Sequence, residues 1–157
     1  MFPGLRDYLV RLGNTKVEAP DAYRGRPTNH GGDVMETIDY DGLMQANAVR
    51  VFSERDPVRR LNAIRELYSA DAVVTEPEGI SKGEEAINGA VTELLSKLPP
   101  TFIFTPVGAA IGHHGVGRLL WKAGPPNGPT AATGMDIAHF KDSRIQALYV
   151  FLDPTVG

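Results

Sequence analysis

The sequence has 157 residues, of which 42% are hydrophobic and 22% charged, with a formal net charge of −3. This length predicts one folded domain with a substantial core, and the acidic balance argues against a nucleic-acid-binding surface, which needs clustered Lys and Arg. The absence of cysteine excludes disulfide scaffolds, thiol catalysis and cysteine-ligated metal centres. No apolar run approaches the roughly 20 residues of a membrane span. Because charges at Arg6, Asp7 and Arg11 interrupt any apolar signal-peptide core, we expect a cytoplasmic protein.

An N-terminal arm over residues 1–35 is predicted to precede an α+β domain over 36–157. The arm is rich in Pro and Gly, and only a short amphipathic helix near 5–12 is indicated by its leucine spacing. We expect the arm to be a tether, or else to pack across a partner subunit or cover a pocket.

Two helices and a strand are predicted next along the chain. Apolar residues at helical spacing predict a helix over 41–54 and a second one ending near 69. Asp56 has the character of an N-cap, followed by Pro57 at the first helical position. The run AVVTE at 72–76 is typical of a short strand, ended by a Pro-Glu-Gly turn.

A third helix is predicted over 82–97. Ser81 and Glu84 have the spacing of a capping box, and a wide apolar stripe follows them. Pro99 and Pro100 cannot continue a helix, so the helix is expected to stop before them.

The remaining sequence changes to an extended pattern. Strands are predicted over 101–111, 116–123, 130–140 and 144–152, separated by turn-forming sequences, which favours an antiparallel meander. Pro106 suggests a bulge or an edge position within the first of them. The element order therefore predicts an α+β fold in which a curved, mostly antiparallel sheet closes over three helices.

The element order and two stretches resemble the cone-shaped α+β barrel superfamily of nuclear transport factor two, ketosteroid isomerase and the SnoaL-like polyketide cyclases. The stretches are LYSADAVVTEPEG at 67–79, followed by a helix start KGEEAI, and GMDIAHFKDSRIQALYVFLD at 134–153. The resemblance covers about residues 40–153 and implies a conical pocket for a hydrophobic small molecule. It also implies a homodimer formed through the outer sheet face.

Glu76 is the first candidate catalytic residue. Ketosteroid isomerase has a general-base carboxylate followed by proline in this local context, and here Glu76 precedes Pro77. A carboxylate facing an apolar cavity could move a proton; a solvated acid at a strand end is the alternative. The resemblance is incomplete, because Ala138 and a position near Ala48 stand where that enzyme has its two oxyanion-stabilising groups. A steroid isomerase in the strict sense is therefore not expected.

Asp136 is the second candidate. It alternates with small residues on one face of the predicted strand 130–140, which leaves room for a ligand if that face is concave. The opposite face, with Met135 and Ile137, is more apolar and competes for the core, in which case Asp136 is a surface acid. Asp136 could partly replace the acid missing at Ala138, which lies on the same strand face.

Asp153 is a third candidate, by resemblance to a late-strand Asp of SnoaL-like cyclases that follows an aromatic residue by four positions, here Tyr149. Limonene epoxide hydrolases of this fold use an Asp-Arg-Asp set, to which Arg118 and Asp153 could belong. That reaction is disfavoured because Leu120 stands where the middle acid is expected. Residues expected to line or back the pocket, unless they are plain core residues, are Phe102, Phe104, Trp121, Ala138, Phe140 and Tyr149.

The sequence favours a cofactor-independent acid–base enzyme of isomerase, cyclase or dehydratase type. The four histidines form no convincing ligand set with a carboxylate, so no metal is expected. GVGRLL at 115–120 lacks the third glycine and the following helix of a dinucleotide-binding motif, so no nucleotide cofactor is expected. A non-catalytic ligand-binding or dimerisation module of the same fold is the alternative.

Overall fold

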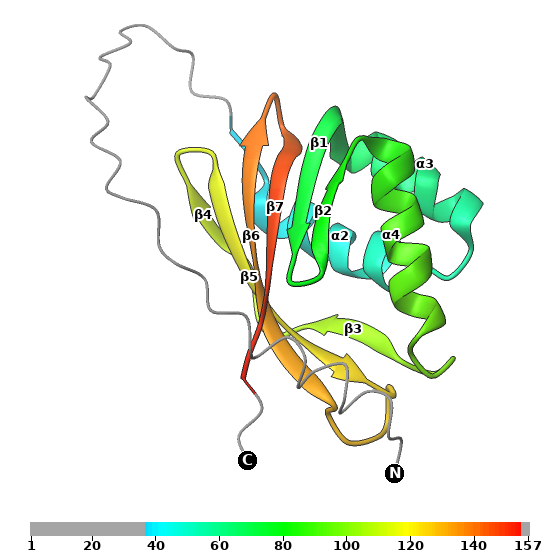
Figure 1. The fold of residues 1–157 in the computed structure, drawn as a ribbon. Coiled ribbons are helices and arrows are strands. Elements are labelled where there is room, and N and C mark those ends of the chain that lie inside the picture. The colour runs from blue at the N-terminus through cyan, green and yellow to red at the C-terminus, as the bar shows by residue number, and fades with distance from the viewer. Residues whose placement is uncertain (1–36, 155–157) are drawn as a thin grey trace, which may run out of the picture.

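Three helices cover one face of a curved sheet in the computed structural model, which describes residues 37–154 (Figure 1). The predicted arm, including its helix near 5–12, lies outside the described residues. The seven strands follow the order β2-β1-β7-β6-β5-β3, with β4 paired separately to β5. Since β1 and β7 run parallel and all other pairs antiparallel, the predicted α+β fold with a mostly antiparallel sheet is confirmed.

The first helical segment changes its hydrogen-bonding pattern midway. Helix α2 (Tyr40–Asn47) continues as the π-helical segment η1 (Ala48–Phe52), so the segment predicted over 41–54 is helical for most of that span. Asp39 caps it by accepting a hydrogen bond of 2.9 Å from the Gly42 amide.

Helix α3 (Pro57–Leu67) begins as predicted, because the Asp56 carboxylate accepts hydrogen bonds from the Val58 and Arg59 amides. It ends two residues before the predicted end, since Tyr68 already belongs to strand β1 (Tyr68–Glu76).

The predicted capping box at Ser81 and Glu84 is wrong. Ser81 lies in strand β2 (Gly79–Lys82), where it pairs with Val74 of β1. Helix α4 (Glu84–Ser96) is instead preceded by Gly83 at a φ of 88°, without a side-chain cap. Cross-strand pairing with β1 therefore holds the residues that local spacing assigned to the helix start.

The strand predicted over 101–111 is interrupted after Pro106, and only its last residue, Ile111, belongs to a second strand, which extends into the predicted turn. Strand β3 (Ile103–Pro106) and strand β4 (Ile111–His113) both pair with β5 (Val116–Gly124). Pro106 ends β3 at the edge of the sheet, as its missing amide hydrogen favours. Strands β6 (Ala132–Lys141) and β7 (Arg144–Leu152) complete the predicted meander with β5.

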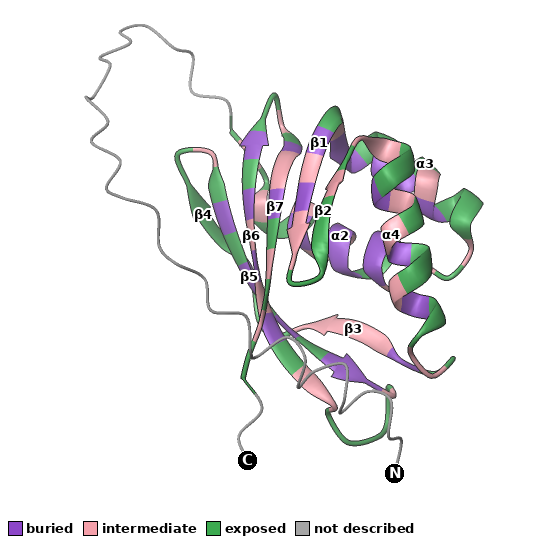
Figure 2. Cartoon of the chain, in the orientation of Figure 1, coloured by how far each residue is buried: buried purple, intermediate pink, exposed green. Residues whose placement is uncertain are grey.

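Alternate residues of β5 and β6 face the helices and form the core (Figure 2). On β6, Asp136 and Ala138 are buried whereas Thr133 and His139 are exposed, so the Asp136 face is the inner one. Aliphatic side chains such as Ile64, Val91 and Leu148 are almost fully buried, and each contributes roughly 1.5–3 kcal/mol. None of the helices in the described part of the chain is long and apolar enough to cross a membrane.

Candidate active site

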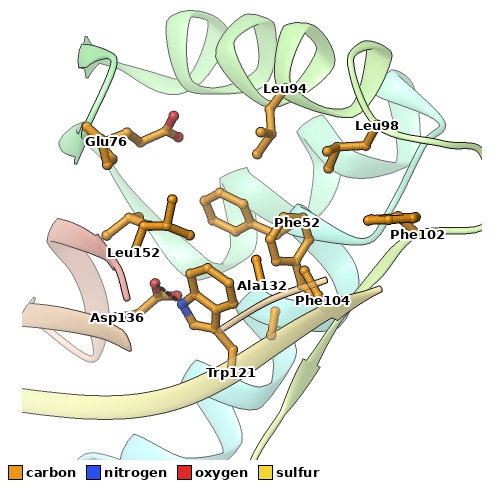
Figure 3. Close-up of a pocket in the computed structure, with 14 residues that line it drawn as sticks. Phe52, Glu76, Leu94, Leu98, Phe102, Phe104, Trp121, Ala132, Asp136 and Leu152 are labelled. Atoms are coloured by element: carbon orange, nitrogen blue, oxygen red, sulfur yellow. Dashed lines mark hydrogen bonds between the residues drawn. The ribbon is translucent and has the colours of Figure 1, made fainter. Parts of the chain in front are cut away.

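A cavity lies between the inner face of the sheet and the helices, and it is lined almost entirely by apolar and aromatic side chains (Figure 3). The space inside it that the centre of a water-sized sphere can occupy is about 80 Å³. Two of its fourteen lining residues are ionisable, and both are acids: Glu76 and Asp136.

Asp136 extends from the inner face of β6 and is only 5% exposed. The Trp121 indole donates a hydrogen bond of 2.9 Å from Nε1 to Asp136 Oδ1. Burial, which disfavours the carboxylate, raises the pKa of Asp136 to about 7; the Trp121 hydrogen bond opposes this rise and the nearby Glu76 charge adds to it. Asp136 can therefore hold or release a proton near neutral pH.

Glu76 is the last residue of β1, which ends where Pro77 begins the turn into β2. Its Oε1 atom is buried without a hydrogen-bond partner in the described part of the chain. Burial, and to a lesser extent the charge of Glu78, raises the pKa of Glu76 above its ordinary value. In Figure 3, Glu76 and Asp136 lie on the same side of the cavity, with Leu152 between them in this view.

Aromatic rings form a continuous part of the cavity wall. Phe104 contacts Phe52 and Trp121 edge to face, with ring centroids 6.1 and 5.4 Å apart. The Ser53 hydroxyl donates to the Phe104 carbonyl and accepts from the Phe104 amide, which fixes this part of β3 against η1. Phe104, which packs against the Trp121 indole, is thus held in place by the end of η1.

Four of the sequence-predicted residues meet at the cavity together with Phe102: Glu76, Asp136, Trp121 and Phe104. Whether the two acids are catalytic stays a prediction.

Four other predicted residues do not line the cavity. Ala138 is fully buried in the core, and Phe140 packs edge to face against Tyr40 at 5.4 Å. Tyr149 is 45% exposed, and Asp153 is an exposed residue whose carboxylate accepts a hydrogen bond of 2.7 Å from Thr133 Oγ1. The residues implied by the cyclase resemblance are therefore separated from the carboxyl pair by the sheet.

Several cavity residues were not singled out from the sequence, because in helices and loops they are indistinguishable from ordinary core positions: Phe52, Leu94 and Leu98. A buried polar pair was also missed. Tyr68 donates a hydrogen bond of 2.5 Å to Asn47 Oδ1. Burial chiefly, with the charges of Asp136 and Glu76, raises the Tyr68 pKa well above its ordinary value, so the hydroxyl stays protonated.

The part of the chain that the structure describes contains no group of three or more His, Asp or Glu side chains that could hold a metal ion. His113, the last residue of β4, and His114, in the turn that follows, are exposed and contact each other.

Neither the known family models nor the curated proteins include a match to this sequence. Solved structures do match. A SnoaL-like protein of Agrobacterium tumefaciens strain C58, provisionally assigned as an isomerase, is 23% identical with a TM-score of 0.67, over 73% of this chain and 97% of its own. A provisionally assigned polyketide cyclase of Sinorhizobium meliloti is 17% identical with a TM-score of 0.54, over 69% and 93%.

A third similar structure was solved with a small molecule. This protein of Catenulispora acidiphila has a ketosteroid isomerase-like fold and was crystallised in complex with trimethylamine; it is 16% identical with a TM-score of 0.56, over 73% of this chain and 86% of its own. At these identities the likeness shows a shared fold.

Proposed function

We propose that this chain, which has the nuclear transport factor two-like fold of the SnoaL-like and ketosteroid isomerase-like proteins, is a cofactor-independent acid–base enzyme acting on a hydrophobic small molecule. Glu76 and Asp136 are its acid–base pair. The observation that carries the proposal is a buried carboxyl group, Asp136, held by an indole N–H in an otherwise apolar cavity that a second carboxyl group also lines.

The two carboxyl groups differ in protonation state and therefore take different roles. The negative charge of Glu76 favours the protonated form of Asp136, so near neutral pH Glu76 is the base and Asp136 the acid. Glu76 removes a proton from a carbon next to a substrate carbonyl. Asp136 donates a hydrogen bond or its proton to the carbonyl oxygen as negative charge develops there. Returning the proton to another carbon completes an isomerisation.

The two positions at which ketosteroid isomerase has oxyanion-stabilising groups carry no hydrogen-bond donor here, which agrees with this assignment of roles. Ala48 lines the cavity without offering a donor, and Ala138 is enclosed in the core. Protonated Asp136 is therefore the one side chain among the described lining residues with a proton to give, apart from the Trp121 indole already bonded to it. The similar proteins assigned as an isomerase and a cyclase, and the one holding trimethylamine, support small-molecule chemistry in this fold.

Deuterium exchange tests the proposal without knowledge of the natural substrate. The rate of α-proton exchange of 4-phenyl-2-butanone in D₂O, followed by NMR, is expected to rise on adding the protein. Glu76→Gln and Asp136→Asn each remove one proton-transfer group at nearly constant shape, so each should lower that rate by about 10²-fold or more.

Matched controls make the same chemical changes on the surface. Glu66→Gln removes an exposed acid paired with Arg50, and Asp142→Asn changes an exposed turn residue whose φ of 52° asparagine tolerates. Both controls should keep the wild-type rate. Exchange that is absent in the wild type, or unchanged in both cavity variants, would contradict the proposal.

The second candidate is a ligand-binding module without chemistry. It is favoured by the absence of the two oxyanion-stabilising groups, whose positions correspond to Ala138 and to a residue near Ala48. Saturable ligand binding without catalysed exchange would select it.

A further inference from the structure

We infer that the substrate of this cavity is an apolar molecule bearing a protonated amine. The inference deepens the proposed function, because it names the substrate class of the same cavity, yet it concerns binding and is tested separately from turnover.

The polar atoms of the lining residues determine which sign of charge a ligand can carry in this cavity. Among the described side chains that line the cavity, Glu76 and Asp136 supply oxygen acceptors, and the single N–H donor, Trp121 Nε1, already bonds to Asp136. No Lys, Arg or His lines it. A carboxylate or phosphate ligand would meet the Glu76 carboxylate and no cation, whereas an ammonium group meets an anionic partner in Glu76 and a carbonyl oxygen acceptor in protonated Asp136.

Glu76 has an acceptor that the protein leaves unused. Its Oε1 atom is buried and accepts no hydrogen bond from any residue between 37 and 154, which costs free energy unless a bound molecule donates one. An ammonium N–H would satisfy this atom. The second oxygen of the same carboxylate then remains for proton transfer, and a positive charge beside the reacting carbon makes its proton easier to remove.

The aromatic wall suits a cation as well. Phe52, Phe104 and Trp121 form a continuous set of rings that ends beside Asp136, to which the Trp121 indole is bonded (Figure 3). Ring faces attract alkylammonium groups, and the attraction is stronger where water is excluded. The remaining lining is aliphatic and would hold the carbon body of the ligand.

A second hollow continues the acidic surroundings of Glu76 outward. It lies between the β1–β2 turn and α4, shares Glu76 and Leu94 with the cavity, and adds Glu78 and Glu93. Lys97 bonds to both of the added acids, at 3.7 and 3.1 Å, so the three carboxylates outnumber this one ammonium. Such a region concentrates cations near the cavity.

The test compares three probes of nearly equal shape that differ in charge. N,N-dimethylbenzylamine is cationic at neutral pH, isobutylbenzene is its neutral carbon analogue, and phenylacetate is an anion. Trp121 is the only tryptophan of the chain and lines the cavity, so its fluorescence reports occupancy directly. We expect the amine to bind at least about tenfold more tightly than isobutylbenzene, and phenylacetate not to bind.

Glu76→Gln should bring the amine's affinity down about tenfold while leaving that of isobutylbenzene unchanged, and Glu66→Gln should change neither. Equal affinity for the amine and its carbon analogue, preference for phenylacetate, or no saturable amine binding to the wild type would overturn the inference. The wild-type comparison needs no variant. Because ketone exchange is measured independently, preference for the amine without exchange contradicts only the proposed reaction, and exchange without amine preference contradicts only this inference.

Discussion

Asp136 is held by the fold in a protonation state that water alone would not favour. Among the residues that the structure describes, its carboxyl group has one hydrogen-bond donor, Trp121, and otherwise faces apolar side chains and the charge of Glu76. A carboxyl group in such surroundings is suited to proton transfer, and its ionisation lowers the free energy of unfolding.

Stability should therefore depend on pH through this residue. The pKa of Asp136 in the folded state, about 7, lies above its ordinary value of 3.8, so the folded state binds the proton more tightly than the unfolded state. Its contribution is fully favourable below pH 3.8 and is lost as the pH rises through 7. Relative to the wild type, Asp136→Asn should gain on the order of 4 kcal/mol of unfolding free energy between pH 4 and pH 8.

Urea unfolding of both proteins at the two pH values measures this gain, and taking the difference cancels all groups that the substitution does not affect. Asp142→Asn serves as the exposed control and should show no such pH-dependent gain. A difference between Asp136→Asn and wild type that stays constant with pH would mean that Asp136 ionises freely in the folded state.

At the scale of single residues, local sequence pointed to the two acids but not to all of their surroundings. Asp136 was identifiable because small residues flank it on one strand face, and Glu76 because it ends a strand before proline. Tyr68 and Asn47 were not identified, because a buried Tyr–Asn pair depends on the packing of α2 against the start of β1. Asp153 matched a spacing, but spacing along a strand end does not say on which side of the sheet the side chain lies.

A glycine of β6, Gly134, leaves the space that the Trp121 indole of β5 occupies. Gly134 lies opposite Trp121 in the antiparallel register, and a Cβ atom at this position would collide with the indole ring and with the Phe151 carbonyl. The absence of a side chain thus lets Trp121 lie flat across β6 toward Asp136, two residues along the same face.

Gly134→Ala should displace the indole, break its hydrogen bond to Asp136, and destabilise the protein by about 2 kcal/mol or more. Red-shifted Trp121 fluorescence together with a lower urea midpoint would show this. Gly79→Ala is the matched strand control, because nothing lies within 4 Å of the added methyl group, and its stability should stay within about 0.5 kcal/mol of wild type. Equal behaviour of the two variants would contradict the role given to Gly134.

Elements defined by their own periodicity were predictable, whereas those defined by distant partners were not. The helices and the β5–β7 meander follow local patterns and short turns. Strand β2 and the early start of β1 depend on pairing with each other and with β7, about 70 residues later, which no local pattern records. The π-helical segment η1 was likewise not predicted, because apolar spacing indicates a helix without distinguishing its hydrogen-bonding pattern.

At the scale of the whole molecule, the outer sheet face carries a row of apolar side chains. Leu120, Met135 and Phe151 are cross-strand neighbours on β5, β6 and β7, and Leu120 and Phe151 are 41% and 51% exposed. We propose that this face forms a homodimer interface, since an exposed apolar row on a sheet favours association.

Light scattering coupled to gel filtration should give a dimer mass for the wild type and a monomer mass for Phe151→Lys, because a buried Lys at an interface centre weakens binding strongly. Ile80→Lys makes the same change on β2, at an exposed residue outside this row, and should remain dimeric. A monomeric wild type, or a dimeric Phe151→Lys variant, would contradict the proposal.

The pH dependence of ketone exchange tests the central claim most directly, because it reports both carboxyl groups in their assigned roles. With Glu76 as base and Asp136 as acid, the exchange rate should rise with pH as Glu76 ionises and fall above about pH 7 as Asp136 loses its proton. The falling limb should be absent from the residual rate of Asp136→Asn. A wild-type rate that keeps increasing from pH 7 to pH 9, or a falling limb that persists in Asp136→Asn, would contradict the account.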